Sequence, residues 1–148
     1  MQILKSFLAR LFGAHVALSA LEIVVLDCVE HHLDPRLRET WHRQIQAINK
    51  IQRLPDGAEV NFYRMKDGHP SFAEALAFPN KTSELLVARV QLNVPGMEKL
   101  TATVWCVKGF VFSIEYIGSA CYFEEAAGMA HSPEFQVDCE LMADLSAA

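Results

Sequence analysis

Three apolar runs separated by two turn signals occupy residues 85–117, and they constrain the fold of this chain more than any other feature. The stretch reads LLVARVQLNVPGMEKLTATVWCVKGFVFSIEYI, with turn residues at Pro95-Gly96 and Lys108-Gly109. Apolar and polar residues alternate within each run, which is the pattern of a strand with one buried face. We therefore predict a meander of three antiparallel strands, with the rest of the chain packed around it.

One face of the first strand in this meander is predicted to be polar. Arg89, Gln91 and Asn93 alternate with apolar residues and are expected to face water. The residues expected to face the core are Leu86, Ala88, Val90, Leu92 and Val94.

The turn at residues 108–109 admits two registers for the strands beside it. A two-residue loop pairs Val107 with Phe110, whereas a three-residue loop pairs Cys106 with Phe110 and sorts apolar from polar residues better. We favour the three-residue loop, which places Trp105 on the face away from the helices. An exposed tryptophan is often a contact anchor in an interface, and the alternative is that a nearby loop covers it. In the favoured register, the residues expected to face inward are Leu100, Ala102, Val104, Cys106, Phe110, Phe112, Ile114 and Tyr116.

Two helices are predicted in the first third of the chain from helical spacing and end signals. Apolar residues at helical spacing over residues 3–12 are followed by Gly13, a natural stop. Ser19 and Glu22 then have the spacing of a capping box, which predicts that a second helix begins there.

A third helix is predicted to begin at Asp34-Pro35 and to end at Leu54. An acidic cap followed by proline is a favoured helix start. The apolar stripe that would carry this helix against the sheet consists of Leu37, Trp41, Ile45, Ile48 and Ile51.

The expected architecture is a single α+β domain over residues 1–148. Residues 1–54 are predicted to be helical and residues 58–144 to form an antiparallel sheet, whose last strand covers 134–144. Three N-terminal helices would then pack on one face of a mostly antiparallel sheet of four to six strands. At this length a chain buries about 70% of the surface that its unfolded form exposes, which is enough for one core.

Composition favours a cytoplasmic protein that binds neither nucleic acid nor a membrane. The net charge is −5, whereas nonspecific nucleic-acid binding needs clustered Lys and Arg. No apolar run approaches the roughly 18 residues of a membrane span, and Arg10 and His15 interrupt the loose outline of a signal peptide. Four cysteines without a CxxC motif fit a reducing compartment.

The acidic residues gather towards the end of the chain. All 13 Lys and Arg residues occur by Lys108, and 7 of the 18 acids follow it, so residues 1–108 carry 13 − 11 = +2 and the remainder carries −7. Such asymmetry points to an oppositely charged partner, although an acidic surface also serves solubility. The predicted partner-binding residues are Glu124, Glu125, Glu134, Asp138, Glu140, Asp144 and Trp105.

No catalytic, cofactor or metal site is predicted from the sequence. Cys28 and His32 are four residues apart on a predicted helix and could share a zinc ion, but no motif supplies a third or fourth ligand. Phosphate-binding glycine loops and nucleophile motifs do not occur. An enzyme that uses Cys28 or Cys121 is an alternative, which predicts one thiol with a lowered pKa.

Two segments, VNFYRMKDGHPSF and NVPGMEKLTATVWCVKGFVFSIEYI, are similar in their strand and turn pattern to small bacterial proteins of contact-dependent growth-inhibition and other polymorphic toxin systems. The resemblance covers residues 59–117. It implies an immunity protein that binds and neutralises a cognate toxin in the cytoplasm, and it carries over no functional residue.

The expected function is therefore non-enzymatic binding of a basic toxin domain, such as a nuclease. A nuclease surface attracts phosphate, so an acidic inhibitor complements its charge. The alternative is a small-ligand or regulatory domain, with a pocket between the helices and a sheet face built from Phe110, Phe112, Ile114 and Tyr116.

Overall fold

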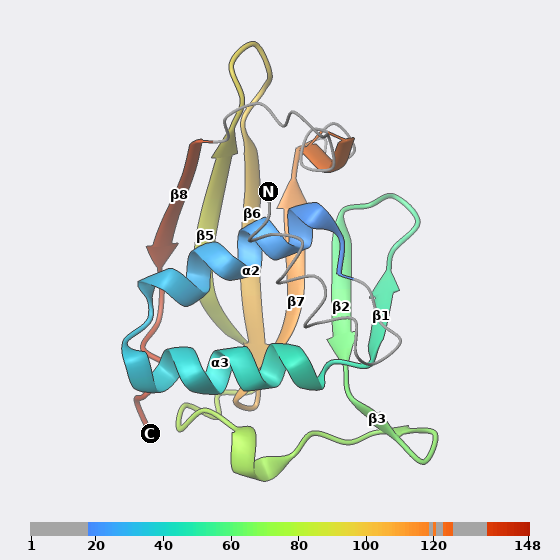
Figure 1. Cartoon of the computed structure of the whole chain (residues 1–148), viewed down its shortest axis with the longest axis vertical. Helices are drawn as coiled ribbons and strands as arrows, with labels where there is room; N and C mark the ends of the chain where they lie inside the picture. Colours follow the sequence, from blue (N-terminus) through green and yellow to red (C-terminus); the bar gives the residue numbers. More distant parts are fainter. Residues whose placement is uncertain (1–17, 119, 121–122, 126–135) are drawn as a thin grey trace.

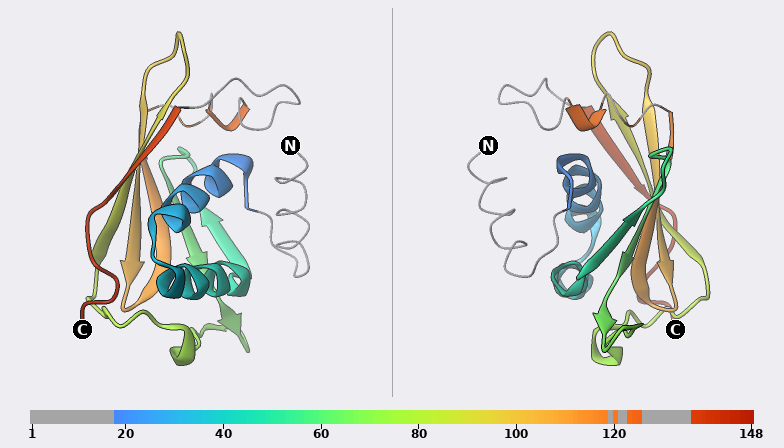
Figure 2. Two further views of the ribbon diagram at one scale, coloured as in Figure 1. Left: turned by 60° about the vertical axis from the view of Figure 1, so that its left-hand side comes forward. Right: turned by 90° about the vertical axis from the view of Figure 1, so that its right-hand side faces the viewer.

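The computed structural model describes residues 18–118, 120, 123–125 and 136–148, and these contain a six-stranded antiparallel sheet with two helices against one face (Figures 1 and 2). In spatial order the strands are β1 (Lys50–Arg53), β2 (Glu59–Tyr63), β7 (Phe110–Ile117), β6 (Leu100–Val107), β5 (Leu85–Asn93) and β8 (Gln136–Leu141). The predicted α+β class and antiparallel meander are confirmed. The predicted helix over residues 3–12 lies outside the described residues.

Helix α2 (Ala20–His32) begins at the predicted capping box. The backbone N–H of Glu22 donates to the Ser19 hydroxyl, and the Glu22 carboxylate accepts from the backbone N–H of Ser19. The helix crosses the sheet diagonally (Figure 1) and buries most of one side against it.

Helix α3 (Pro35–Ala47) also begins as predicted, because the Asp34 side chain accepts from the backbone N–H groups of Arg36 and Leu37. It ends at Ala47, however, and the predicted continuation to Leu54 is wrong. Residues 50–53 form β1 instead, an edge strand paired with β2.

A buried charge explains why the chain leaves the helix there. Arg53 on β1 donates to both carboxylate oxygens of Glu22, at 2.9 and 2.8 Å, and only 3% of the Glu22 side chain is exposed. A buried carboxylate needs such a partner. A helix continued through Arg53 would withdraw the guanidinium from α2, so the ion pair and the sheet edge favour the strand.

The β6–β7 hairpin differs from the predicted register at its turn and agrees with it further along. Val107 pairs with Phe110 around a two-residue loop, in which Lys108 and Gly109 both have positive φ, at 50° and 90°. The predicted three-residue loop is therefore wrong. Both φ values fit a type I′ turn, whose twist matches the flanking strands.

A β-bulge in β7 then restores the predicted pairing. Trp105 lies opposite Ser113 and Cys106 opposite Val111, so Phe112 is an extra residue. Trp105 thus lies on the face away from the helices, as predicted. Phe112 was expected to face inward but lies on that same outer face, where its ring meets Tyr63 edge-on at 5.4 Å.

A second bulge, in β5, places Leu86 on the outer face, although it was predicted to face inward. The register shifts between Leu86 and Ala88, with Val87 as the extra residue, and Leu86 lies opposite Trp105 on the outer face. The other four predicted inward residues of this strand are buried, as is Val87.

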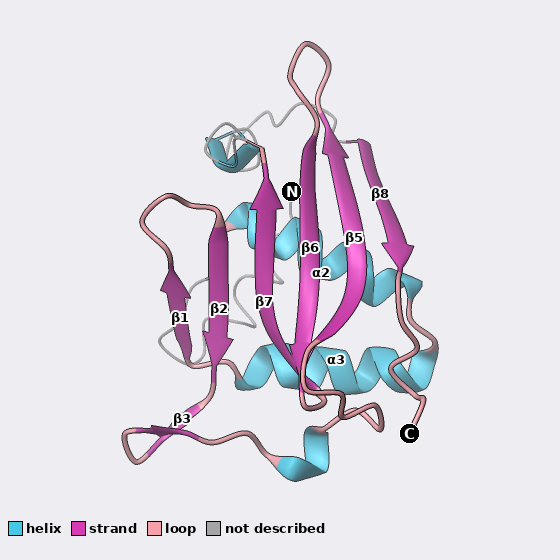
Figure 3. Cartoon of the chain, turned by 180° about the vertical axis from the view of Figure 1, so that it is seen from behind, coloured by secondary structure: helices cyan, strands magenta, loops and turns pink. Residues whose placement is uncertain are grey.

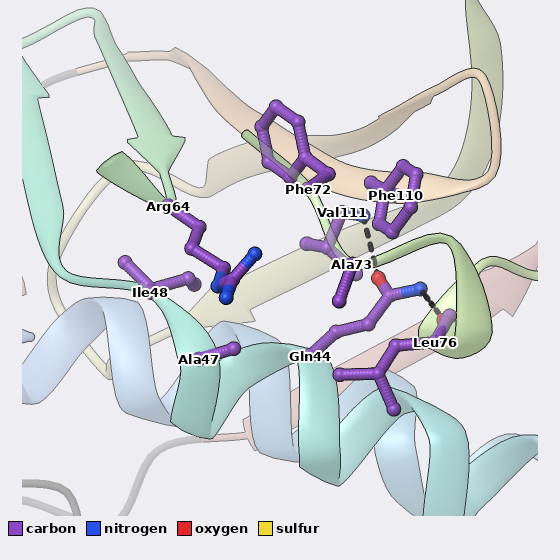
Figure 4. A pocket seen from close by; sticks show the side chains of 9 residues that line it. All are labelled: Gln44, Ala47, Ile48, Arg64, Phe72, Ala73, Leu76, Phe110 and Val111. Carbon is purple, nitrogen blue, oxygen red and sulfur yellow. Dashed lines mark hydrogen bonds between the residues drawn. The ribbon is translucent and has the colours of Figure 1, made fainter. Parts of the chain in front are cut away.

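Between β2 and β5 the chain forms a two-stranded hairpin and a short 3-10 helix below the sheet. The hairpin pairs β3 (Met65–Lys66) with β4 (His69–Pro70), and η2 covers Glu74–Leu76. Gln44 of α3 holds this segment to the β6–β7 turn (Figure 4). Its buried amide donates to the carbonyls of Leu76 and Gly109, and accepts from the N–H of Val111.

No helix among the described residues has the length and apolarity that a transmembrane span requires.

Candidate functional site

The sheet face turned away from α2 and α3 is the surface on which we look for a binding site (Figure 3). Both helices lie on the other face, and no described helix covers this one (Figures 2 and 3). We call it the open face. The residues that project from it alternate along each strand with the buried core residues, so the same periodicity that builds the core also selects this surface.

A cavity of about 150 Å³ lies on the open face where β6, β7 and β2 meet. The residues that line it are Glu59, Glu84, Trp105, Cys106, Val107, Phe112, Ser113 and Glu115. Three of these side chains are carboxylates, two are aromatic and none is basic.

Trp105 projects from β6, an inner strand of the sheet, and is half-buried. Its Nε1–H donates to the Thr103 hydroxyl, at 3.2 Å, within the same strand. Leu86 and Ser113 are its cross-strand neighbours. The indole is therefore fixed by its neighbours while part of its surface remains accessible, which is how aromatic anchors of interfaces are presented.

Two of the carboxylates are direct cross-strand neighbours. Glu59 of β2 lies opposite Glu115 of β7, and neither has a salt bridge to any residue that the structure describes. Like charges at directly opposite positions destabilise an antiparallel pair. A cation supplied from outside the chain would remove that cost.

Two of the predicted acidic residues, Asp138 and Glu140, also lie on the open face. Both are exposed on β8, opposite Gln91 and Arg89 of β5. They lie on the edge strand of the sheet, and β5 separates them from β6 and Trp105.

The other predicted acidic residues do not join this surface. Asp144 follows β8, and its carboxylate accepts from the N–H and hydroxyl of Ser146, which lowers the pKa of Asp144 below its ordinary value. Glu124 accepts from the Ser19 hydroxyl at the start of α2, on the helical side, and Glu125 is its exposed neighbour. Glu134 lies outside the described residues. The described members of this predicted set therefore do not lie on one surface, and their role in binding a partner stays a prediction.

Sequence reasoning missed Glu59, Glu84 and Glu115. Glu115 lies between Ile114 and Tyr116, which the favoured register places inward, so its position on the face of Trp105 follows from the alternation. The positions of Glu59 and Glu84 could not be predicted in this way. They line the cavity from β2 and from the segment before β5, and which strands lie beside those segments depends on strand order.

The predicted ligand pocket between helices and sheet is not formed by its four expected residues. Ile114 and Tyr116 are buried in the core, and Phe112 lies on the open face. Phe110 does line a small pocket with Gln44, Arg64 and Phe72 (Figure 4). Its volume of about 20 Å³ holds roughly one water molecule.

A cluster of two thiols and an imidazole lies on the helical side of the sheet. Cys28 and His32 of α2 meet Cys139 of β8, and the potential ligand atoms of all three lie within 4.8 Å of one another. The hydrogen bond from Cys139 lowers the pKa of Cys28 to about 7, and His32 acts in the same direction. The same contact, together with burial, raises the pKa of Cys139. The sequence showed the pair on α2 but no third donor.

Comparisons with known proteins add no relative: no protein-family model, curated protein or solved structure matches the chain.

Proposed function

We propose that the protein binds a basic partner protein through the open face and acts as an immunity protein that neutralises a cognate toxin domain in the cytoplasm. The observation that carries this proposal is the cavity in which three carboxylates and an indole ring lie together without a basic lining residue. No catalytic step is assigned to this surface.

The cavity suits one Lys or Arg side chain of the partner. A guanidinium or ammonium over the indole gains a cation–π interaction, and the carboxylates offer charge-assisted hydrogen bonds. An incoming cation also relieves the repulsion between Glu59 and Glu115, which lie side by side in the free protein. The bound state therefore gains from a contact that costs stability in the unbound state.

Asp138 and Glu140 at the edge of the open face would accelerate association. Exposed charges at the rim of an interface act mainly on the rate of encounter, and their effect is screened by salt. The half-buried Trp105 acts mainly on dissociation, because a desolvated aromatic anchor holds the formed complex.

The proposal predicts that the reading frame next to the gene of this chain encodes a toxin domain. The test measures binding to that domain by surface plasmon resonance at low and physiological salt. Trp105→Ala should raise the dissociation rate at least about tenfold, the effect of losing one anchor. Glu39→Lys is the matched control, since Glu39 is exposed on α3, on the opposite side of the sheet.

Growth of cells that express the toxin domain gives a second readout. Cells should survive with the wild-type protein and with Glu39→Lys, and should lose protection with Trp105→Ala. If Trp105→Ala binds the toxin domain and protects cells as well as Glu39→Lys does, the open face is not the toxin-binding surface.

A further inference from the structure

We propose that Cys28, His32 and Cys139 form a binding site for Zn²⁺ that ties the C-terminal half of α2 to the edge strand β8. This site lies on the helical side of the sheet, and the inference is independent of the open face and of its proposed partner.

The fold brings the three donors together from two distant segments. Cys28 and His32 are four positions apart in the sequence, so they share one side of α2. Cys139 alternates along β8 with the exposed Asp138 and Glu140, and therefore projects towards α2. Strand order completes the site, because β8 joins the sheet beside β5 and thereby lies under the helix.

The distances are close to those of a metal site. Zinc binds thiolate sulfur at about 2.3 Å and imidazole nitrogen at about 2.0–2.1 Å, so tetrahedral ligands lie roughly 3.4–3.8 Å apart. The potential donor atoms of the cluster lie within 4.8 Å of one another. Side-chain rotations that move the donor atoms by about one ångström would close the site around an ion of this size. His32 is exposed and Cys28 and Cys139 are half-buried, so both the rotation and the entry of an ion are sterically open.

The donor set selects the kind of ion. Two thiolates and an imidazole favour zinc over magnesium or calcium, which prefer oxygen ligands. Metal binding displaces the thiol protons to solvent. The third donor also favours a metal over a simple disulfide between Cys28 and Cys139, because a disulfide gives His32 no role.

The surroundings of His32 prepare it for this role. Its Nδ1–H donates to the backbone carbonyl of Cys28, at 2.8 Å, which leaves Nε2 with a lone pair in that tautomer. Three protein donors leave one tetrahedral position for water or an external ligand. Next to the cluster, His32, Asp34 and Asp144 line an open hollow of about 490 Å³ from which such a ligand could approach.

The experiment titrates the reduced full-length protein with Zn²⁺ in competition with a chromophoric chelator, and with Co²⁺ as a spectroscopic probe. We expect one Zn²⁺ per chain, a higher melting temperature with zinc, and the thiolate-to-cobalt charge-transfer absorption of a tetrahedral site. His32→Gln should weaken zinc binding at least about tenfold, as loss of a ligand does. Cys139→Ser should remove part of the charge-transfer absorption.

His31→Gln is the matched control, because His31 is the next residue and is also exposed on α2, but it is not part of the cluster. Its zinc affinity should stay within about twofold of the wild-type value. Since His32 is exposed, His32→Gln is expected to fold even if Cys139→Ser does not. Absence of one-to-one binding, or equal affinity of His32→Gln and His31→Gln, overturns the proposal. A metal-free protein with a Cys28–Cys139 disulfide after purification without reductant, and no zinc binding after reduction, assigns the cluster to redox chemistry instead.

Discussion

Glu59 and Glu115 lie directly opposite each other on β2 and β7, on the face of the sheet that no described helix covers. Both line the cavity that contains Trp105, and the lining holds no cation to separate them. Two adjacent carboxylates are tolerated in a sheet at some cost in stability. Their position next to an accessible indole is the main reason to regard this surface as a binding site.

Neutralising one member of this pair should stabilise the free protein. We expect Glu115→Gln to raise the free energy of unfolding by a few tenths of a kcal/mol, the usual size of a cross-strand charge effect. Urea denaturation at low salt measures this, and the gain should shrink at high salt. In the double variant of Glu59→Gln and Glu115→Gln, the gain in the free energy of unfolding should be smaller than the sum of the gains of the two single variants. Full additivity would show that the two carboxylates do not interact.

Reversing the charges at the sheet edge should slow partner association. Asp138→Lys combined with Glu140→Lys is expected to lower the association rate constant about tenfold or more at low salt, and to flatten its dependence on salt. The dissociation rate should change little. Stopped-flow or surface plasmon resonance measurements against the toxin domain report both rates, and unchanged association would remove this strand from the interface.

Gln44 should contribute more to stability than any exposed glutamine. Its buried amide makes three hydrogen bonds, to Leu76, Gly109 and Val111. Gln44→Ala removes all three bonds, and the Gly109 carbonyl then keeps only its bond from the N–H of Phe78, so we expect a loss of about 3 kcal/mol in the free energy of unfolding. Gln46→Ala, an exposed position on the same helix, is the control and should stay within about 0.5 kcal/mol of wild type.

His31 should make stability depend on pH. Its Nδ1 donates to the carbonyl of Asp27 and lies 3.5 Å from the Asp27 carboxylate, which raises the pKa of His31 above its ordinary value. Because the pKa of His31 is higher in the folded than in the unfolded state, its protonation stabilises the fold. This stabilisation is fully present below the unfolded-state pKa of about 6.5, and it is lost as the pH rises through the folded-state pKa.

His31→Gln should therefore lower the free energy of unfolding by a few tenths of a kcal/mol at about pH 5.5 and leave it unchanged at about pH 8.5. Urea denaturation of the metal-free protein at the two pH values measures the difference. An equal effect at both would mean that protonation of His31 is not its source.

Much of the sheet could be predicted because its strands are long and regularly alternating. The apolar periodicity of residues 85–117 identifies three strands, and side-chain caps at Ser19 and Asp34 identify the starts of α2 and α3. The end of α3 could not be predicted, because Ile48 and Ile51 fit helical spacing as well as a short strand. The decision depends on the distant ion pair between Arg53 and Glu22.

The two candidate sites were harder to predict because they depend on strand order and, in the first site, on a β-bulge. A single extra residue in β7 moves Phe112 to the open face, and no local signal marks such a bulge. Cys139 meets Cys28 only because β8 adds to the sheet beside β5 rather than beside β7, its predecessor among the sheet strands. The sequence contains residue types that bind zinc, but it does not show that Cys139 lies close to Cys28 and His32.

The position of β8 also has a consequence for synthesis on the ribosome. Strand β5 ends at Asn93, whereas the strand that pairs with its free edge begins only at Gln136. A nascent chain that has already formed the β5–β6–β7 meander therefore presents unpaired backbone donors and acceptors along β5 until β8 leaves the exit tunnel. Such an edge is a template for other chains, so the interval between the two strands is the time at which this protein is most exposed to aggregation and to chaperone binding.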